Sequence, residues 1–221
     1  GFARGCKANG CALIGGETAQ MPGFYQAGEY DVSGTIVGVV DQTQMLDGRK
    51  TKSGDVVIGL GSSGLHTNGY SLARNILFDK AKLKPSTRLA DLGGKVGDAL
   101  MAVHLSYSNV VHRLLKRFNP RGKTPAVQSM AHITGGGFQD NIPRNLPPNL
   151  DVKIQRGSWE IPPLFNYLQS AGKVSEAEMF HVFNMGVGLT MTVRANKATD
   201  ILKAIRRSEH QAWIIGEVID G

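Results

Sequence analysis

Glycine is the residue that most constrains how this chain can fold. The 221 residues include 28 glycines, several of them in short clusters at Gly15-Gly16, Gly61 to Gly64 and Gly135 to Gly137. No repeat or low-complexity tract accounts for these clusters, so they indicate turns in which the backbone must come close to another group. Each cluster follows a short apolar stretch. The sequence therefore predicts three glycine-rich bends, and we expect them to fold toward a shared hollow.

Residues 46–221 have the pattern of a self-sufficient α/β (α+β) domain. Apolar periodicity and turn residues predict strands over 56–60, 187–193 and 212–219, and helices over 68–78, 98–118, 137–146, 162–171 and 197–207. Because strands and helices alternate, we expect a layered domain in which helices pack on one face of a mixed sheet.

Residues 1–45 hold too few elements to form a domain alone. We expect a helix over 2–9 and strands over 11–14 and 30–40. One helix and two strands cannot bury both faces of a sheet. The chain also begins Gly1-Phe2-Ala3-Arg4, without an initiator methionine. We therefore interpret residues 1–45 as the last elements of an incomplete amino-terminal domain.

The charge and composition favour small anionic ligands. The formal net charge is +7, which attracts anions at long range. Basic residues are dispersed and only 7% of residues are aromatic, whereas a nucleic-acid groove needs a basic face interleaved with aromatics. We therefore expect phosphorylated small molecules rather than nucleic acid as partners.

The cysteines and the apolar segments indicate the compartment. Cys6 and Cys11 form neither a disulfide framework nor a paired metal-ligand spacing, which is typical of a reducing compartment. No apolar run approaches the length of a membrane span, and no signal peptide is present. We expect a cytoplasmic protein without membrane contact.

The most informative stretch is residues 59–70, where an apolar strand enters a Gly/Ser turn before a helix opens. Backbone N–H groups at a helix start suit phosphate oxygens, and hydroxyl and amide side chains add donors. The predicted binding residues here are Ser62, Ser63, Gly64, Thr67 and Asn68, and His66 can donate a hydrogen bond or move a proton near neutral pH. The alternative is a tight turn in which Thr67 or Asn68 only caps the helix. No Gly-Lys-[Ser/Thr] follows, so the stretch is not a Walker loop.

The second informative stretch is residues 131–144, which contains three consecutive glycines. Successive backbone N–H groups in such a run can turn inward as an anion nest. The predicted binding residues are Thr134, Gly135, Gly136, Gly137, Asn141 and Arg144, and His132 is a second candidate for proton transfer. The alternatives are a flexible connection with a surface arginine, and a buried, hydrogen-bonded His132 in the core.

The third stretch, residues 13–22, places a carboxylate beside two glycines just after a predicted strand. Mg²⁺ prefers oxygen ligands and often takes one or two carboxylates together with phosphates and water. Gly15, Gly16, Glu17 and Thr18 are therefore candidate nucleotide-binding residues, with Glu17 as the magnesium ligand. The alternative is that Glu17 merely caps a turn.

Taken together, these stretches resemble the phosphoribosylformylglycinamidine cyclo-ligase (AIR synthetase) family. The matches run in order along nearly the whole chain: GCALIGGETA at 10–19, MPG at 21–23, YDVSG at 30–34, GDVVIGLGSSGLHTNGYSL at 54–72, AHITGGGF at 131–138, NIPR at 141–144 and FNMGVG at 183–188. The block at 61–72 is the most specific.

The resemblance implies a two-domain protomer that dimerises through its amino-terminal domain. It also implies a reaction that uses ATP and Mg²⁺. ATP activates the formamide oxygen of formylglycinamidine ribonucleotide as an iminophosphate, and the amidine nitrogen of the same molecule closes the ring, releasing ADP and phosphate. By resemblance, Glu17 serves the nucleotide side, the bends at 62–68 and 134–137 line the substrate cleft, and His66 and His132 bond or move protons.

This chain departs from the family pattern in two places. It lacks the amino-terminal part, with its nucleotide-binding segment and Asp-Gly-x-Gly-Thr-Lys motif, so we expect no cyclo-ligase activity from this chain alone. The family usually carries Pro-Thr-Arg-Ile-Tyr where this chain has Val103-His104-Leu105-Ser106-Tyr107. The fixed positive charge of that arginine is therefore absent.

Two other functions fit the same residues. A related ATP-dependent enzyme, such as formylglycinamidine synthetase, selenophosphate synthetase, thiamine-phosphate kinase or the hydrogenase maturation factor, would use similar bends on another substrate. A non-catalytic module could bind phosphate or a partner chain without chemistry, since unpaired strand edges in residues 1–45 would invite pairing.

Overall fold

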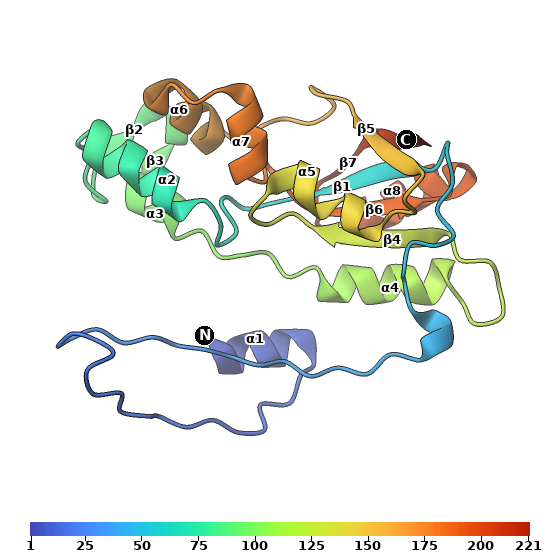
Figure 1. The fold of residues 1–221 in the computed structure, drawn as a ribbon, viewed down its shortest axis with the longest axis horizontal. Coiled ribbons are helices and arrows are strands. Elements are labelled where there is room, and N and C mark those ends of the chain that lie inside the picture. The colour runs from blue at the N-terminus through green and yellow to red at the C-terminus, as the bar shows by residue number, and fades with distance from the viewer. The chain divides into compact units, whose positions relative to one another are not determined.

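The computed structural model describes residues 1–221, which divide into two compact units, Gly1–Met45 and Leu46–Gly221. Each unit is described by itself below. Figure 1 labels the elements.

The larger unit is built on a five-stranded sheet. Its strands are β1 (Val56–Gly61), β4 (Val127–His132), β5 (Leu150–Ile154), β6 (Val187–Val193) and β7 (Ala212–Asp220), in the order β4-β6-β1-β7-β5. Every pairing is antiparallel, so the expectation of a mixed sheet is wrong. Alternation of strands and helices along the chain does not fix strand direction, because β1 pairs with two strands far away in sequence.

Helices cover both faces of the sheet, so the expectation of a single covered face is wrong. All seven positions of β6 are buried, which requires packing above and below it. One face packs against α4 (Ser108–Phe118) and α8 (Ala195–Arg206). The other packs against α2 (Tyr70–Arg74), α5 (Gly137–Asn141), α6 (Pro163–Gly172) and α7 (Glu176–Val182).

The helix expected over 98–118 is interrupted. A short helix, α3 (Val96–Leu100), ends before an irregular segment at 101–107, and α4 then begins at Ser108. The apolar stripe misled the prediction because Met101 and Val103 are largely exposed rather than packed on the core. The break matters because it brings the 101–107 segment to the end of β1, where the Tyr107 hydroxyl donates to the Gly61 carbonyl at 2.7 Å.

Most other expected elements of the larger unit are confirmed within one or two residues, including β1, β6, β7, α6 and α8. The helix expected over 137–146 is shorter, because α5 ends at Asn141 and a 3-10 turn with Pro143 follows. The helix expected over 68–78 is α2 followed by a π-helical segment, Asn75–Lys80. No strand was expected at β4 or β5 and no helix at α7. The remaining elements of the larger unit are a small hairpin of β2 (Arg88–Leu89) with β3 (Gly94–Lys95), and 3-10 turns at Ala90–Leu92 and Pro143–Asn145. A further 3-10 turn, Gln42–Gln44, belongs to the smaller unit. No helix combines the length and apolar character that crossing a membrane requires.

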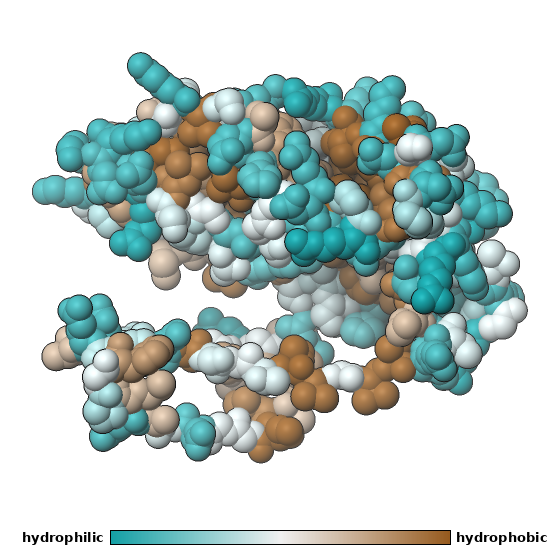
Figure 2. Space-filling view, in the orientation of Figure 1, coloured by the Kyte–Doolittle hydropathy of each residue, from teal (hydrophilic) through white to brown (hydrophobic).

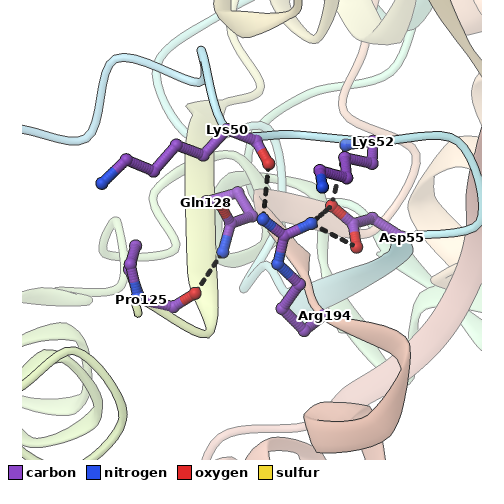
Figure 3. A network of polar contacts seen from close by, with 6 residues as sticks. All are labelled: Lys50, Lys52, Asp55, Pro125, Gln128 and Arg194. Atoms are coloured by element: carbon purple, nitrogen blue, oxygen red, sulfur yellow. Dashed lines mark hydrogen bonds and ion pairs between the residues drawn. The ribbon is translucent and has the colours of Figure 1, made fainter. Parts of the chain in front are cut away.

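An ion pair ties the start of β1 to the start of α8 in the larger unit (Figure 3). The Arg194 guanidinium lies 3.1 Å from the Asp55 carboxylate and also donates to the Lys50 carbonyl at 2.7 Å. The Asp55 side chain is 6% exposed and the Arg194 side chain 21%. Because both charges are largely removed from water, each depends on the other.

The smaller unit contains one helix and mostly extended chain. The expected helix is confirmed as α1 (Phe2–Asn9), which ends at Gly10 in the left-handed conformation. The strands expected over 11–14 and 30–40 are absent, because those residues have no ladder partner and a strand needs one for its backbone groups. Their apolar side chains stay exposed, with Ile14 94% and Val39 100% accessible. Figure 2 shows the resulting hydrophobic surface on this unit, the blue part of Figure 1.

Candidate functional site

The first predicted bend begins where β1 ends. After Gly61 the chain turns through residues 62–68, and His66 and Thr67 both adopt positive φ angles, 50° and 67°. Consecutive residues other than glycine in this region are strained, and such strain is concentrated at functional sites. The helix that follows starts with Gly69 as its N-cap and has no side-chain cap. The interpretation of Thr67 or Asn68 as a simple cap is therefore wrong.

The second bend begins where β4 ends. Gly137 is required there, since a Cβ at this position would lie 1.8 Å from the Phe180 carbonyl oxygen and its φ is +58°. Asn141 lies buried under the bend, and its amide donates to the Gly137 and Gly135 carbonyls at 2.7 and 3.2 Å. The Thr134 hydroxyl donates to the side-chain oxygen Oδ1 of Asn141 at 3.1 Å. Asn141 therefore shapes the bend from beneath.

Asn68 joins the two bends. Its side-chain oxygen accepts the Gly135 backbone N–H at 3.1 Å, and its amide donates to the His66 carbonyl at 2.9 Å. The Gly137 N–H is also used within the protein, by the Thr134 carbonyl at 3.0 Å. The expected anion nest therefore has two of its glycine donors already engaged. The bends lie on the same side of the domain, side by side.

Three histidines gather where the bends meet. The His66 and His104 rings stack with centroids 4.0 Å apart, and the His104 and His132 Nε2 atoms are 3.2 Å apart. His66 is buried, His104 is half-buried and His132 is exposed. The core interpretation of His132 is therefore wrong. His104 lies in the irregular segment between α3 and α4, and the sequence marks it only as a departure from the family pattern, because its placement depends on that break.

The environment keeps the three histidines neutral. Burial lowers the pKa of His66 to about 3, with further contributions from the neighbouring His104 and His132. Burial and the neighbouring His132 lower the pKa of His104, and partial burial lowers the pKa of His132. At neutral pH the cluster can therefore accept or donate hydrogen bonds and bind cations. His104 supplies no fixed positive charge in place of an arginine.

Buried polar contacts hold the first bend in place. Asn184, in the segment before β6, accepts from the Ser62 hydroxyl at 2.9 Å and donates to the Gly64 carbonyl at 2.8 Å. Asn184 belongs to the Asn-Met-Gly-Val-Gly stretch at 184–188, but nothing in that stretch alone predicts its contact with the first bend. The Ser63 hydroxyl donates to the Val103 carbonyl at 2.6 Å, and so connects the bend to the segment that carries His104.

The other predicted residues lie apart from this cluster or in the other unit. Arg144 is exposed in the 3-10 turn after α5, and its guanidinium donates to the side-chain oxygen Oδ1 of Asn141 at 3.4 Å. Gly15, Gly16, Glu17 and Thr18 are exposed in the smaller unit. A hollow of about 430 Å³ is lined by Phe138, Gln139, Ile142, Arg156 and Phe180 among others, and contains none of the predicted site residues. The histidine cluster therefore lies outside this hollow, and His132 is its exposed member.

The fold is shared with solved structures of low sequence identity. The thiamine-monophosphate kinase of Stenotrophomonas maltophilia superposes with a TM-score of 0.55 at 14% identity, over 82% of this chain and 52% of that one. A hydrogenase maturation protein HypE gives a TM-score of 0.51 at 16% identity, over 78% of this chain and 46% of that one. At this identity the likeness defines a fold class and nothing more.

Sequence comparison defines the family. Residues 52–221 match the AIR synthase related protein, C-terminal domain, and the chain belongs to this family. The phosphoribosylformylglycinamidine cyclo-ligase of Sorangium cellulosum is 48% identical over 219 residues, 99% of this chain and 62% of that protein. The enzyme of the same name from Geobacillus thermodenitrificans is 46% identical over 221 residues, 100% of this chain and 62% of that protein. The family resemblance is confirmed, and the chain spans about 62% of the length of these curated relatives.

Proposed function

We propose that this chain supplies the substrate side of an ATP-dependent ligase that closes formylglycinamidine ribonucleotide to aminoimidazole ribonucleotide in purine biosynthesis. The observation that carries the proposal is the hydrogen bond between Asn68 and Gly135, which brings two glycine-rich bends and their histidines to one surface. Such an arrangement suits a phosphorylated ribonucleotide, because hydroxyl and amide side chains of both bends lie near the histidines and can turn from their internal partners toward phosphate oxygens.

ATP and Mg²⁺ are part of the proposed reaction. Glu17 is an exposed carboxylate beside Gly15-Gly16, and one carboxylate with phosphates and water is a donor set that Mg²⁺ accepts. Glu17 would hold the ion on the nucleotide side, where the ion would neutralise phosphate charge, and Thr18 would contact the nucleotide. Gly15 and Gly16 have no side chains, so the backbone there can come close to a nucleotide phosphate.

In the proposed reaction the γ-phosphoryl group passes to the formamide oxygen, and the P–O bond to ADP breaks. The amidine nitrogen then forms the new C–N bond, phosphate leaves with its oxygen, and the nitrogen loses a proton. The residues of this chain orient the substrate and handle that proton. Lowered pKa values keep His66 and His132 unprotonated at pH 7. With a pKa of about 3, His66 is a weak base that suits a hydrogen bond to the substrate, whereas the exposed His132 can accept the proton. Positioning of two groups of one molecule supplies much of the acceleration.

The direct test joins this chain to the amino-terminal part of the 48%-identical Sorangium cellulosum relative. We expect ADP release from this chimera that depends on formylglycinamidine ribonucleotide, and none from the 221-residue chain alone. Thiamine phosphate in place of the ribonucleotide distinguishes a related kinase. Stimulation by thiamine phosphate, or a chimera that binds the ribonucleotide without ADP release, would refute the proposed reaction in favour of a kinase or a binding module.

We also propose that the ligase is a cytoplasmic homodimer that binds no nucleic acid. The exposed apolar side chains of residues 30–40, without ladder partners, support pairing of the smaller unit with another chain. The dispersed basic residues and the 7% aromatic content support small ligands over nucleic acid. Sedimentation of the chimera tests the dimer, and a monomer at micromolar concentration would rule it out.

A further inference from the structure

We propose that His66, His104 and His132 form a site for one borderline divalent transition-metal ion, of the class of Zn²⁺, on the surface where the two bends meet. One ring nitrogen from each residue lies within 4.8 Å of the others. Its ligands are histidine nitrogens, whereas the proposed Mg²⁺ site uses the carboxylate of Glu17. The histidine site shares His66 and His132 with the proposed ligase reaction, and a ring nitrogen that ligates the ion cannot accept a proton at the same time.

The distances suit such an ion after small side-chain rotations. Zn²⁺ binds histidine nitrogen at about 2.0–2.1 Å, so neighbouring ligands in a tetrahedral site lie about 3.4 Å apart. The His104 and His132 Nε2 atoms are already 3.2 Å apart. His66 and His104 are stacked, so one of these rings must turn to complete the set. The 101–107 segment that carries His104 is irregular and mostly exposed up to Ser106, which permits that movement.

The hydrogen bonds of His66 leave one nitrogen without a partner. Its Nε2 lies 3.0 Å from the Ser63 hydroxyl and the Ser63 amide and 3.3 Å from the Leu105 amide. Its Nδ1 is buried and has no hydrogen-bond partner. Because two backbone amides donate to Nε2, the ring proton of the metal-free chain lies on Nδ1. A buried polar atom without a partner is rare, and a change of tautomer with a bound ion would relieve it in a residue that is 1% exposed.

One tautomer of His66 makes Nδ1 a metal ligand. The Ser63 hydroxyl gives its proton to the Val103 carbonyl at 2.6 Å, so its oxygen can accept a proton from Nε2 of His66. The lone pair then resides on Nδ1, and the Ser63 and Leu105 amides, which donate to Nε2 in the metal-free chain, must turn away from that atom when the ion binds. A ligating histidine usually donates its other ring N–H in this way.

The donor set selects the class of ion. Three neutral imidazoles suit Zn²⁺, Cu²⁺ or Ni²⁺, whereas Mg²⁺ prefers oxygen ligands. His132 is exposed, so a fourth position opens to solvent, and no carboxylate belongs to the cluster. Three protein ligands and one open position are typical of sites whose fourth ligand is water or a substrate oxygen.

The test is calorimetric titration of ZnCl₂ into the metal-free 221-residue chain. Cys6 and Cys11 are free thiols that could bind zinc themselves, so the experiment uses a Cys6→Ser/Cys11→Ser background. We expect one zinc ion per chain. His104→Thr, which removes the imidazole and keeps a small polar side chain, should weaken binding at least about 100-fold, because losing a direct ligand costs more than losing an outer-shell partner. His132→Ala should do the same.

His112→Ala is the matched control, because it removes an exposed histidine of α4 that is outside the cluster. It should leave zinc affinity unchanged. Circular dichroism and thermal unfolding of each metal-free variant check that it is folded. The visible spectrum of Co²⁺ bound to the unmutated cluster reports the coordination geometry without any variant, and we expect it to be tetrahedral. No zinc binding in the Cys-free background, equal weakening by His112→Ala, or an octahedral Co²⁺ spectrum would overturn the proposal. Because zinc binding is measured without nucleotide, its outcome is separate from that of the chimera assay.

Discussion

The His66 and His104 rings stack with centroids 4.0 Å apart and planes inclined by 19°, although the residues come from different segments of the chain. His66 belongs to the bend after β1, and His104 to the irregular segment between α3 and α4. This contact determines the electrostatics of the candidate site. Two imidazoles in van der Waals contact cannot both carry a proton without mutual repulsion.

The first prediction is that acid destabilises the metal-free protein through this cluster. An unfolded histidine has a pKa near 6.5, whereas in the folded state that of His66 falls to about 3 and those of His104 and His132 are also lowered. Below pH 6.5 the unfolded chain therefore binds more protons, so the free energy of unfolding decreases as pH falls from 6.5 toward 3. Urea unfolding at pH 8, 6.5 and 5 with a chelator measures this. His104→Gln should reduce the loss, and an unchanged loss would contradict the assignment to the cluster.

The second prediction concerns the buried ion pair of Figure 3. Asp55→Asn removes the charge that faces Arg194, whose side chain is only 21% exposed. Breaking a buried pair leaves an uncompensated charge, so we expect a loss of about 3 kcal/mol in the free energy of unfolding, measured by urea denaturation. Asp47→Asn is the matched control. Its partner Arg49 is 85% exposed, so the cost should stay below about 1 kcal/mol. Equal losses in the two variants would show that burial does not decide the effect.

The third prediction is that Asn68→Ala separates the two bends. The change leaves the Gly135 N–H without its partner and removes the bond to the His66 carbonyl. We expect kcat/KM for the ribonucleotide in the chimera to fall at least about tenfold, because misplaced binding groups lose orientation. Asn75→Ala removes an exposed asparagine of the neighbouring helical segment and should have no effect. Full activity of the Asn68 variant would show that the contact is not needed for function.

Sequence reasoning placed the bends correctly because their determinants are local. A strand that ends in glycines and opens a helix is encoded in a dozen consecutive residues, so the bends at 62–68 and 134–137 could be identified without the fold. We expected the bends to share a hollow, but the sequence offered no contact that joins them. It depends on Asn68 reaching Gly135, 67 positions away, which no periodicity reveals.

The misses have a common cause in tertiary structure. The 98–118 segment has a helical apolar stripe. The Tyr107 hydroxyl, however, donates to the Gly61 carbonyl at the end of β1, and the residues just before Tyr107 are not helical. Residues 30–40 have the β-branched composition of a strand, yet no ladder partner is present and strand structure needs one. Local propensity is therefore a weak guide wherever a long-range contact decides the backbone.

The fourth prediction isolates the contact that breaks the helix. Tyr107→Phe removes the hydroxyl that donates to the Gly61 carbonyl at 2.7 Å inside the domain. Because a buried carbonyl is left unpaired, we expect a loss of about 1–2 kcal/mol in the free energy of unfolding. Tyr30→Phe, on a side chain that is 85% exposed, should change it by less than about 0.5 kcal/mol. Indistinguishable unfolding midpoints for the two variants would mean that the hydroxyl contributes nothing.

The fifth prediction concerns Gly188 of β6, which lies against the site. A Cβ at this position would be 2.3 Å from the Tyr107 hydroxyl oxygen and 2.7 Å from Nδ1 of His66, so Gly188→Ala must push both side chains away. Such overpacking typically costs about 1–3 kcal/mol, and unfolding experiments should show a loss in this range.

The same change should disturb the histidine cluster, because it displaces the nitrogen of His66 that has no partner. Zinc titration of Gly188→Ala should therefore show weaker binding than in the unmutated chain. Gly94→Ala is the control, since the nearest atom to its new methyl group would be 4.0 Å away, and it should leave both quantities unchanged. If Gly188→Ala binds zinc with full affinity while losing stability, Nδ1 of His66 is not the ligand, and the metal site must use its Nε2 atom instead.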